Sequence, residues 1–149
     1  MKIALLTLCI GASSLSLPQT ALAESPANSQ TATASKPMIV AHRGSSAQAP
    51  ENTLPAFQLA WKQAADAIET DLQLTKDGHI ICFHDKDTKR VNGQPLAIAD
   101  ATLEELRQLD MGRIQPQDSE RALRAWSSDQ YKGVQIPTIA EVFATVPAG

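Results

Sequence analysis

Strand-like and helix-like patterns alternate along the chain from Pro37 onward. Residues 38–41 are a short apolar run, and residues 54–64 carry apolar side chains at steps of three and four. Thr53 or Asn52 stands before this helix pattern as its cap. Strands interleaved with helices favour an α/β fold with a parallel sheet.

The later segments continue this order. Residues 67–74 alternate between apolar and polar side chains, residues 80–84 are apolar, and "KDG" between them predicts a turn. A long polar loop is predicted over residues 112–136. Two further helices are predicted by capping boxes, formed by Thr102 with Glu105 and by Thr138 with Glu141. About three βα units fit, whereas a complete eight-unit barrel needs about 250 residues. We therefore expect an incomplete domain in these 149 residues.

The N-terminus predicts a secretory signal peptide. Residues 1–23 hold one charge, Lys2, followed by the apolar run "IALLTLCIGA" and by "ALA" before Glu24, which is typical of cleavage after Ala23. An N-terminal membrane anchor is the alternative, but an apolar run of about ten residues is shorter than the roughly 20 that span a bilayer. We expect a secreted or periplasmic protein.

The composition of the chain limits its domain boundaries and the kinds of partner it can bind. Residues 24–36 have no large apolar side chain and predict a flexible linker, which leaves residues 37–149 as the domain. The formal net charge is −3 and no basic run occurs, which argues against nucleic acid as a partner. After residue 23 the sequence predicts no stable membrane insertion. Cys82 is the single cysteine beyond that point, so no disulfide within the mature chain is expected.

The segment "AIETDLQL", residues 67–74, places two acids on one face of a strand. Because alternate strand residues share a face, Glu69 and Asp71 point the same way. A solvated polar face is one interpretation. The flanking apolar strands favour the other, an enclosed face where two carboxylates about 7 Å apart would repel each other and lose hydration. A divalent cation relieves both penalties, and oxygen donors suit Ca²⁺ or Mg²⁺.

Two apolar strands end in histidine, at His42 and at His84. If the strands are parallel, both imidazoles reach the carboxyl edge of the sheet, where α/β folds place their sites. A lone histidine is usually structural, but two beside paired acids favour acid–base work near neutral pH. His79, in the "KDGHI" turn, has no such setting and is expected at the surface.

The residues next to these histidines suit an anionic substrate. Arg43 is either an ordinary surface charge or a bidentate fork for phosphate oxygens. Gly44 lets the backbone bend away at that point. Asp85 either orients a neighbouring histidine or caps the following turn, and the sequence leaves both possibilities open.

Three motifs in order resemble one known family. "HRGSSAQAPENTLPAF", "IETDLQLTKDG" and "FHD" are similar to segments of the glycerophosphodiester phosphodiesterases, as are "RVNG", "TLEEL" and "IPTIAEV". The likeness runs from about Met38 to the C-terminus. It implies a TIM-type barrel, incomplete here, and the metal-dependent hydrolysis of glycerophosphodiesters to an alcohol and sn-glycerol 3-phosphate.

The resemblance also implies roles for single residues. His42 matches the proton acceptor and His84 the proton donor. Glu69 and Asp71 match the first two metal ligands, and Arg43 the phosphate contact. The attacking group is water or the substrate's own glycerol hydroxyl.

One ligand of the family pattern is not matched. The third metal-binding Glu lies on a later strand of the family, and this sequence reaches Gly149 before any such segment. Glu141 is no substitute, because its capping box occupies it. Three alternatives to the leading interpretation stay open: a related phosphodiesterase acting on lysophospholipids or phosphoinositides, a catalytically dead truncated chain, and a non-enzymatic phosphodiester-binding module.

Overall fold

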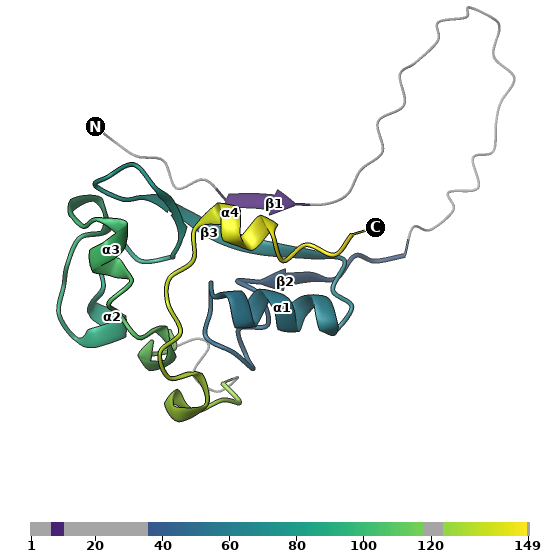
Figure 1. Ribbon diagram of the computed structural model, residues 1–149. Helices are drawn as coiled ribbons and strands as arrows, with labels where there is room; N and C mark the ends of the chain where they lie inside the picture. Colours follow the sequence, from purple (N-terminus) through teal and green to yellow (C-terminus); the bar gives the residue numbers. More distant parts are fainter. Residues whose placement is uncertain (1–6, 11–35, 118–123, 149) are drawn as a thin grey trace, which may run out of the picture.

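The computed structural model describes residues 7–10, 36–117 and 124–148. Its central element is β3 (Ala67–Leu74), to which β2 (Val40–His42) is paired in parallel through α1 (Leu54–Lys62). Figure 1 shows α1 lying against this part of the sheet. The strand–helix–strand unit confirms the expected α/β fold.

The hairpin after β3 differs from the expectation. β4 (Ile80–Cys82) pairs with β3 antiparallel, not parallel, with Leu72 opposite Cys82. The reason is the length of the connection, because the "TKDGH" turn, residues 75–79, holds too few residues for a crossover helix. The chain therefore returns along β3, and the sheet is mixed.

A fourth strand lies in the segment expected to be a signal peptide. β1 (Thr7–Ile10) pairs antiparallel with β3, with Thr7 opposite Asp71 and Ile10 opposite Ile68. β3 is therefore the middle strand of the order β1-β3-β2 (Figure 1). The rest of the expected signal peptide and of the linker, apart from Lys36, lies outside the described residues.

Side-chain caps start the helices as the sequence predicts. Thr53, not Asn52, caps α1, which ends at Lys62 because Ala64 has a left-handed φ of 59°. Both capping boxes form, one on α3 (Leu103–Leu106) and one on α4 (Ile139–Phe143). Where it is described, the expected long loop includes two short 3₁₀ turns, and its residues 118–123 lie outside the described part. The remaining short helices are α2 (Lys89–Asn92), η1 (Ile98–Asp100), η2 (Met111–Arg113) and η4 (Ser128–Tyr131).

Two apolar clusters meet at β4, because alternate residues of a strand face opposite sides. Ile81 belongs to the larger cluster, together with Phe83 and residues from the segment that follows the hairpin. Cys82 belongs to the other cluster, which joins α1, β3 and α4. The end of β4 is thus buried on both faces, at Ile81 and Cys82, and this fixes the position of the chain that leaves the hairpin.

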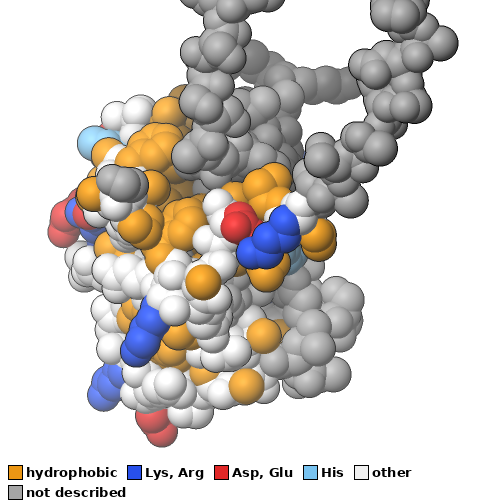
Figure 2. Space-filling model, turned by 90° about the vertical axis from the view of Figure 1, so that its right-hand side faces the viewer, with side chains coloured by type: hydrophobic (Ala, Val, Ile, Leu, Met, Phe, Trp, Pro, Cys, Tyr) orange, Lys and Arg blue, Asp and Glu red, His pale blue; other side chains and the backbone are white. Residues whose placement is uncertain are grey.

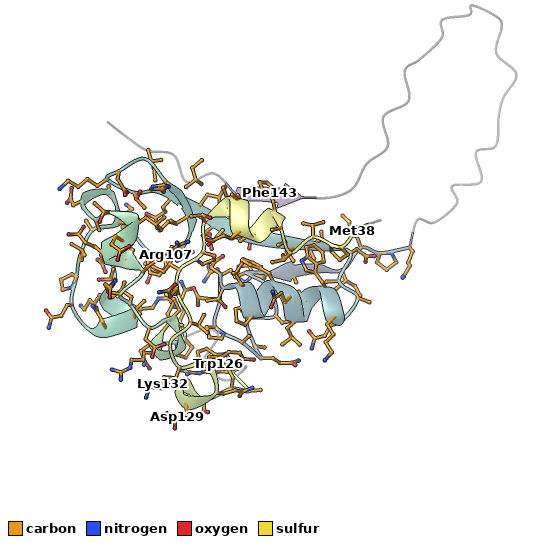
Figure 3. The ribbon with its side chains drawn as sticks, in the orientation of Figure 1. Met38, Arg107, Trp126, Asp129, Lys132 and Phe143 are labelled. Atoms are coloured by element: carbon orange, nitrogen blue, oxygen red, sulfur yellow. The ribbon has the colours of Figure 1, made fainter. Side chains whose placement is uncertain are left out.

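β2 and the two residues before it are more exposed than their apolar composition suggested. Met38, Ile39 and Val40 are 64%, 60% and 41% exposed, so the expectation that both faces of the sheet are covered is wrong along β2. Figure 2 shows hydrophobic side chains gathered on the face toward this end of the sheet, and Figure 3 labels Met38 and the exposed Phe143 of α4. Among the described residues, no helix has the length and apolar character that a membrane span requires.

Candidate active site

The end of β2 brings His42 to the middle strand. His42 is the register partner of Glu69, and its Nε2 lies 3.9 Å from Glu69 Oε2. The next backbone N–H, of Arg43, donates to the same carboxylate oxygen at 3.2 Å. The His42 side chain is 57% exposed and the Glu69 side chain 13%, so the carboxylate is enclosed and the imidazole lies at the surface.

A sharp turn follows His42. Arg43 and Gly44 both have left-handed φ values, of 55° and 78°. At Gly44 a side chain could not fit, because an added Cβ would lie 2.7 Å from the carbonyl carbon of Ala56 in α1. The backbone bends away as the sequence predicted, and the turn directs the Arg43 side chain inward, where it is 6% exposed.

The Arg43 guanidinium lies between two carboxylates. Its Nη1 donates to Glu51 Oε1 at 3.1 Å, and its Nε is 3.1 Å from Asp71 Oδ2. It is therefore a buried ion-paired group and not an ordinary surface charge. The predicted contact between Arg43 and phosphate stays a prediction.

Asp71 is enclosed by polar partners. It is 5% exposed, so a solvated polar face is the wrong interpretation of "AIETDLQL" at this position. Asn52, with a left-handed φ of 55°, donates from its Nδ2 to Asp71 Oδ2 at 3.0 Å and accepts from Thr70 Oγ1 at 2.8 Å. Asn and Asp adopt this backbone conformation more readily than other non-glycine residues. Asn52 thus organises the acid instead of capping α1.

The returning hairpin brings His84 to the same strand from the opposite direction. The Phe83 N–H donates to the Asp71 carbonyl at 3.0 Å, which places the following residue, His84, beside the middle of β3. The two histidines therefore approach β3 through one parallel and one antiparallel neighbour. The convergence of the two imidazoles at the carboxyl edge stays a prediction, and the all-parallel sheet expected to produce it is wrong. His79 is 52% exposed on the turn, as expected.

Asp85 orients His84. Its Oδ1 lies 2.7 Å from His84 Nδ1, and Arg90 pairs with the same carboxylate. Burial opposes the ionisation of Asp85, but hydrogen bonds from Arg90 and His84 outweigh it and lower its pKa. Because an ionised carboxylate only accepts, the contact with Asp85 assigns a proton to Nδ1 and leaves Nε2 for another partner. The Gln117 side chain also lies 3.1 Å from Nδ1. The sequence left two roles open for Asp85, and the structure shows the first of them, the orientation of a neighbouring histidine.

Arg90 joins the two histidine-bearing segments. It donates from Nη1 to Glu51 Oε2 at 3.0 Å and from Nη2 to Glu51 Oε1 at 2.7 Å, besides its contact with Asp85. Burial disfavours its charge, but Glu51 and Asp85 raise its pKa above the ordinary value. Sequence reasoning assigned no role to Glu51 or Arg90, and it considered Asn52 only as a helix cap. The "PENT" and "RVNG" segments were available signals, because both resemble the family.

Glu69 and Asp71 supply oxygen donors of the type a hard divalent cation prefers. Within the described ranges, no group of three or more His, Cys, Asp or Glu side chains is placed to hold a metal. The donor chemistry therefore fits a cation, but these two carboxylates alone make an incomplete ligand set.

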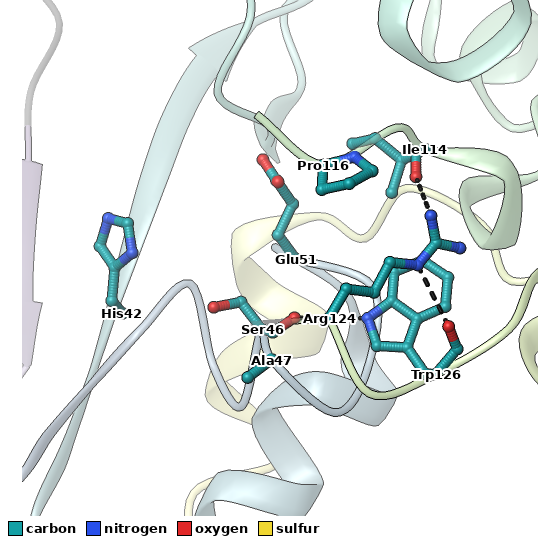
Figure 4. A pocket seen from close by; sticks show the side chains of 8 residues that line it. All are labelled: His42, Ser46, Ala47, Glu51, Ile114, Pro116, Arg124 and Trp126. Atoms are coloured by element: carbon teal, nitrogen blue, oxygen red, sulfur yellow. Dashed lines mark hydrogen bonds between the residues drawn. The ribbon is translucent and has the colours of Figure 1, made fainter. Parts of the chain in front are cut away.

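A cavity of about 200 Å³ opens beside His42. Its walls come from the turn after β2 and from the irregular segment before and after residues 118–123 (Figure 4). The lining residues are His42, Ser46, Ala47, Glu51, Ile114, Pro116, Arg124 and Trp126. The cavity thus lies next to one of the two candidate acid–base groups.

The fold and the site define an α/β protein in which imidazoles, carboxylates and arginines meet along one strand. The sequence matches the family model of the Glycerophosphoryl diester phosphodiesterase family over residues 42–149, and the chain belongs to this family. It is 39% identical over 111 residues to a glycerophosphodiester phosphodiesterase of Caldanaerobacter subterraneus, covering 74% of this chain and 41% of that protein.

Solved structures give the same result. An Oleispira antarctica phosphodiesterase, in complex with the product sn-glycerol-3-phosphate, aligns with a TM-score of 0.59 and 36% identity over 73% of this chain and 39% of that one. A glycerophosphodiester phosphodiesterase from Thermotoga maritima aligns with a TM-score of 0.55 and 35% identity, covering 75% and 40%. The chain spans about two fifths of the length of these relatives.

Proposed function

We propose that this chain carries the acid–base half of a glycerophosphodiester phosphodiesterase, which hydrolyses glycerophosphodiesters to sn-glycerol 3-phosphate and an alcohol. The observation that carries the proposal is that β2 and the segment after β4 bring His42 and His84 to β3, the strand that holds the enclosed Glu69 and Asp71. Family membership and the neighbour with bound sn-glycerol 3-phosphate support the substrate class.

In the proposed reaction, His42 accepts a proton from the attacking oxygen, which is that of water for direct hydrolysis. If the substrate's own glycerol hydroxyl attacks, the first product is a cyclic phosphate, and water opens it to sn-glycerol 3-phosphate in a second displacement. The new bond forms between the attacking oxygen and phosphorus, and the bond between phosphorus and the alcohol oxygen breaks. His84 donates a proton to the departing alkoxide from Nε2, while Asp85 at Nδ1 stabilises the imidazolium before the transfer. The exposure of His42 and the fixed orientation of His84 suit these two roles.

Arg43, Glu69 and Asp71 set the charge around the phosphate in this proposal. Ca²⁺ or Mg²⁺, when bound by Glu69 and Asp71, would neutralise negative charge on the phosphoryl oxygens. Arg43 already contacts Asp71, and rotation of its guanidinium from Glu51 toward the ligand would supply the predicted phosphate contact. The location in this proposal is the extracytoplasmic space, because the sequence predicts a secretory signal over residues 1–23.

The release of sn-glycerol 3-phosphate from a glycerophosphodiester tests this function. His42→Ala and His84→Ala are each expected to lower kcat by roughly a hundredfold or more, the usual loss when an acid–base group is removed. His79→Ala is the matched control, since its ring is exposed on the hairpin turn. Wild-type rates in both active-site variants, or no turnover by the chain at any concentration of Ca²⁺ or Mg²⁺, would contradict the proposal.

A further inference from the structure

Two dipeptides of this chain, Asp77–Gly78 and Asn92–Gly93, pair a short acid or amide side chain with a following glycine. At such a pair the glycine nitrogen can attack the side-chain carbonyl carbon and close a succinimide ring, because a glycine has no Cβ to obstruct the approach. Both glycines have a left-handed φ, of 84° and 78°, and nothing lies within 4 Å of a Cβ added at either. The glycines themselves therefore do not distinguish the two dipeptides.

The Asp77 side chain is held as a carboxylate, which opposes ring formation. Its Oδ1 accepts from the Thr75 hydroxyl at 2.6 Å and from the Leu103 N–H at 3.1 Å, and its Oδ2 lies 3.3 Å from the same N–H. The hydrogen bond from Thr75 lowers the pKa of Asp77, because it favours the charged form. An ionised carboxylate is a poor electrophile, so the fold protects this dipeptide.

The Asn92 side chain is exposed at the last position of α2 and has the opposite setting. Its Oδ1 accepts from the Gln94 N–H at 3.0 Å, and no hydrogen bond within the described part of the chain holds its Nδ2. The Gln94 N–H polarises the side-chain carbonyl and would stabilise the oxyanion that forms on attack. The Asn92 amide nitrogen can depart into solvent as ammonia.

The Gly93 nitrogen becomes available when the end of α2 opens. Its N–H donates to the Lys89 carbonyl at 2.8 Å and so closes this four-residue helix. A helix of one turn has little stability of its own, and helix ends open at a small cost in free energy. The hydrogen bond therefore slows the attack on the Asn92 side chain without preventing it.

We propose that Asn92 is a site of spontaneous deamidation in the folded protein, and that the fold spares Asp77 from the matching isomerisation. The Gly93 nitrogen forms a bond to Cγ of Asn92, the bond from Cγ to Nδ2 breaks, and the Gly93 amide proton leaves with the departing nitrogen as ammonia. Water then opens the succinimide. Cleavage of the new bond to Cγ gives aspartate, and cleavage of the bond to the main-chain carbonyl carbon gives isoaspartate, which lengthens the main chain by one methylene.

Isoaspartate at this position would disturb the turn that carries Arg90. The Arg90 side chain contacts Glu51 and Asp85 and so joins the segments that follow the two histidines. A longer main chain displaces the backbone that closes on the Lys89 carbonyl. We therefore expect the converted protein to unfold at a lower urea concentration than the fresh protein.

The test follows deamidation in the full chain by peptide mass spectrometry during incubation at neutral and mildly alkaline pH, with isoaspartate detected by enzymatic methylation of its carboxyl group. Asn92 is expected to convert at least about tenfold faster than Asn52, which is 1% exposed and reacts only if a larger part of the fold opens. The rate at Asn92 should rise with pH, because the attacking nitrogen must lose its proton. Asn92→Gln is the matched control, since its longer side chain cannot close the same ring.

A parallel incubation in urea separates the effect of the fold from that of the local sequence. The folded and unfolded rates at Asn92 should agree within about tenfold, whereas Asn52 should convert only in the unfolded chain. No conversion of Asn92 in the folded chain while the unfolded chain converts, or isoaspartate formed as fast at Asp77 as at Asn92, overturns the inference. An unchanged urea midpoint of the converted protein overturns the effect on α2. None of these measurements depends on turnover, so they stand even if the proposed function fails.

Discussion

Arg90 of α2 holds Glu51, 39 residues earlier in the chain, through two parallel hydrogen bonds of 3.0 and 2.7 Å. This bidentate pair connects the segment that follows His42 to the segment that follows His84. Because Glu51 also accepts from Arg43, and Arg90 also contacts Asp85, one chain of charges joins the surroundings of both imidazoles. Their relative position therefore depends on Arg90, whose hydrogen bonds go to Glu51, to Asp85 and to the Gln115 carbonyl.

Arg90→Met should destabilise the fold strongly. The change would leave Glu51 and Asp85 partly buried without their shared cation, and loss of one partner of a buried pair typically costs about 3–5 kcal/mol. Urea unfolding measures the difference in the free energy of unfolding. Arg90→Lys should recover part of it, since an ammonium cannot form the bidentate pair. Lys89→Met, at the exposed neighbouring position of α2, is the control, and an equal loss there would contradict the role of the network.

Gly44→Ala should destabilise the protein far more than Gly93→Ala. Both glycines have a φ of 78°, so both changes carry the same left-handed strain, of about 1 kcal/mol or more. At Gly44 the added Cβ would also lie 2.7 Å from the Ala56 carbonyl carbon, whereas nothing lies within 4 Å of a Cβ at Gly93. We expect an extra loss of roughly 1–3 kcal/mol at Gly44 from this overlap, read from thermal or urea unfolding. Equal losses at the two positions would show that α1 moves away freely.

Local patterns predicted much of the fold and of the site. The helix starts were predictable because Thr53, Thr102 and Thr138 each satisfy backbone N–H groups within three residues of themselves. The placement of Glu69 and Asp71 on the same face of β3 followed from the two-residue period of a strand. These features depend on neighbours in sequence, and so the sequence alone contains them.

Features that depend on distant partners were not predictable. The direction of β4 was missed because an apolar strand reads the same whether it pairs parallel or antiparallel, although the short turn was a usable sign. Asn52 looked like a helix cap, but its side chain reaches Thr70 and Asp71 instead. Arg90 and Glu51 carry opposite charges, as many surface residues do. Only their contact across 39 positions shows that they link the segments after His42 and after His84.

Activity should require a divalent cation. Removal of metal with a chelator is expected to abolish turnover, and added Ca²⁺ or Mg²⁺ to restore it, because Glu69 and Asp71 would otherwise leave negative charge facing the phosphate. Glu69→Gln should raise the cation concentration needed for half-maximal activity. Glu104→Gln, on the exposed side of α3, serves as the control. Full activity of the metal-free protein would contradict the assignment of Glu69 and Asp71 as ligands.

Asp85 should make stability depend on pH in the acid range. Burial opposes its ionisation, but Arg90 and His84 outweigh it, so the folded-state pKa lies below the ordinary value of about 3.9. The stabilisation is therefore fully present above that ordinary value and is lost as the pH falls through the folded-state pKa. Asp85→Asn should be less stable than wild type at neutral pH, with a gap that narrows below about pH 4. Urea unfolding at a series of pH values measures this gap, and other acids cancel in the difference. Asp129→Asn, at the exposed turn labelled in Figure 3, should match wild type throughout. A gap for Asp85→Asn that stays constant down to pH 3 would mean that the loss comes from packing and not from the charge.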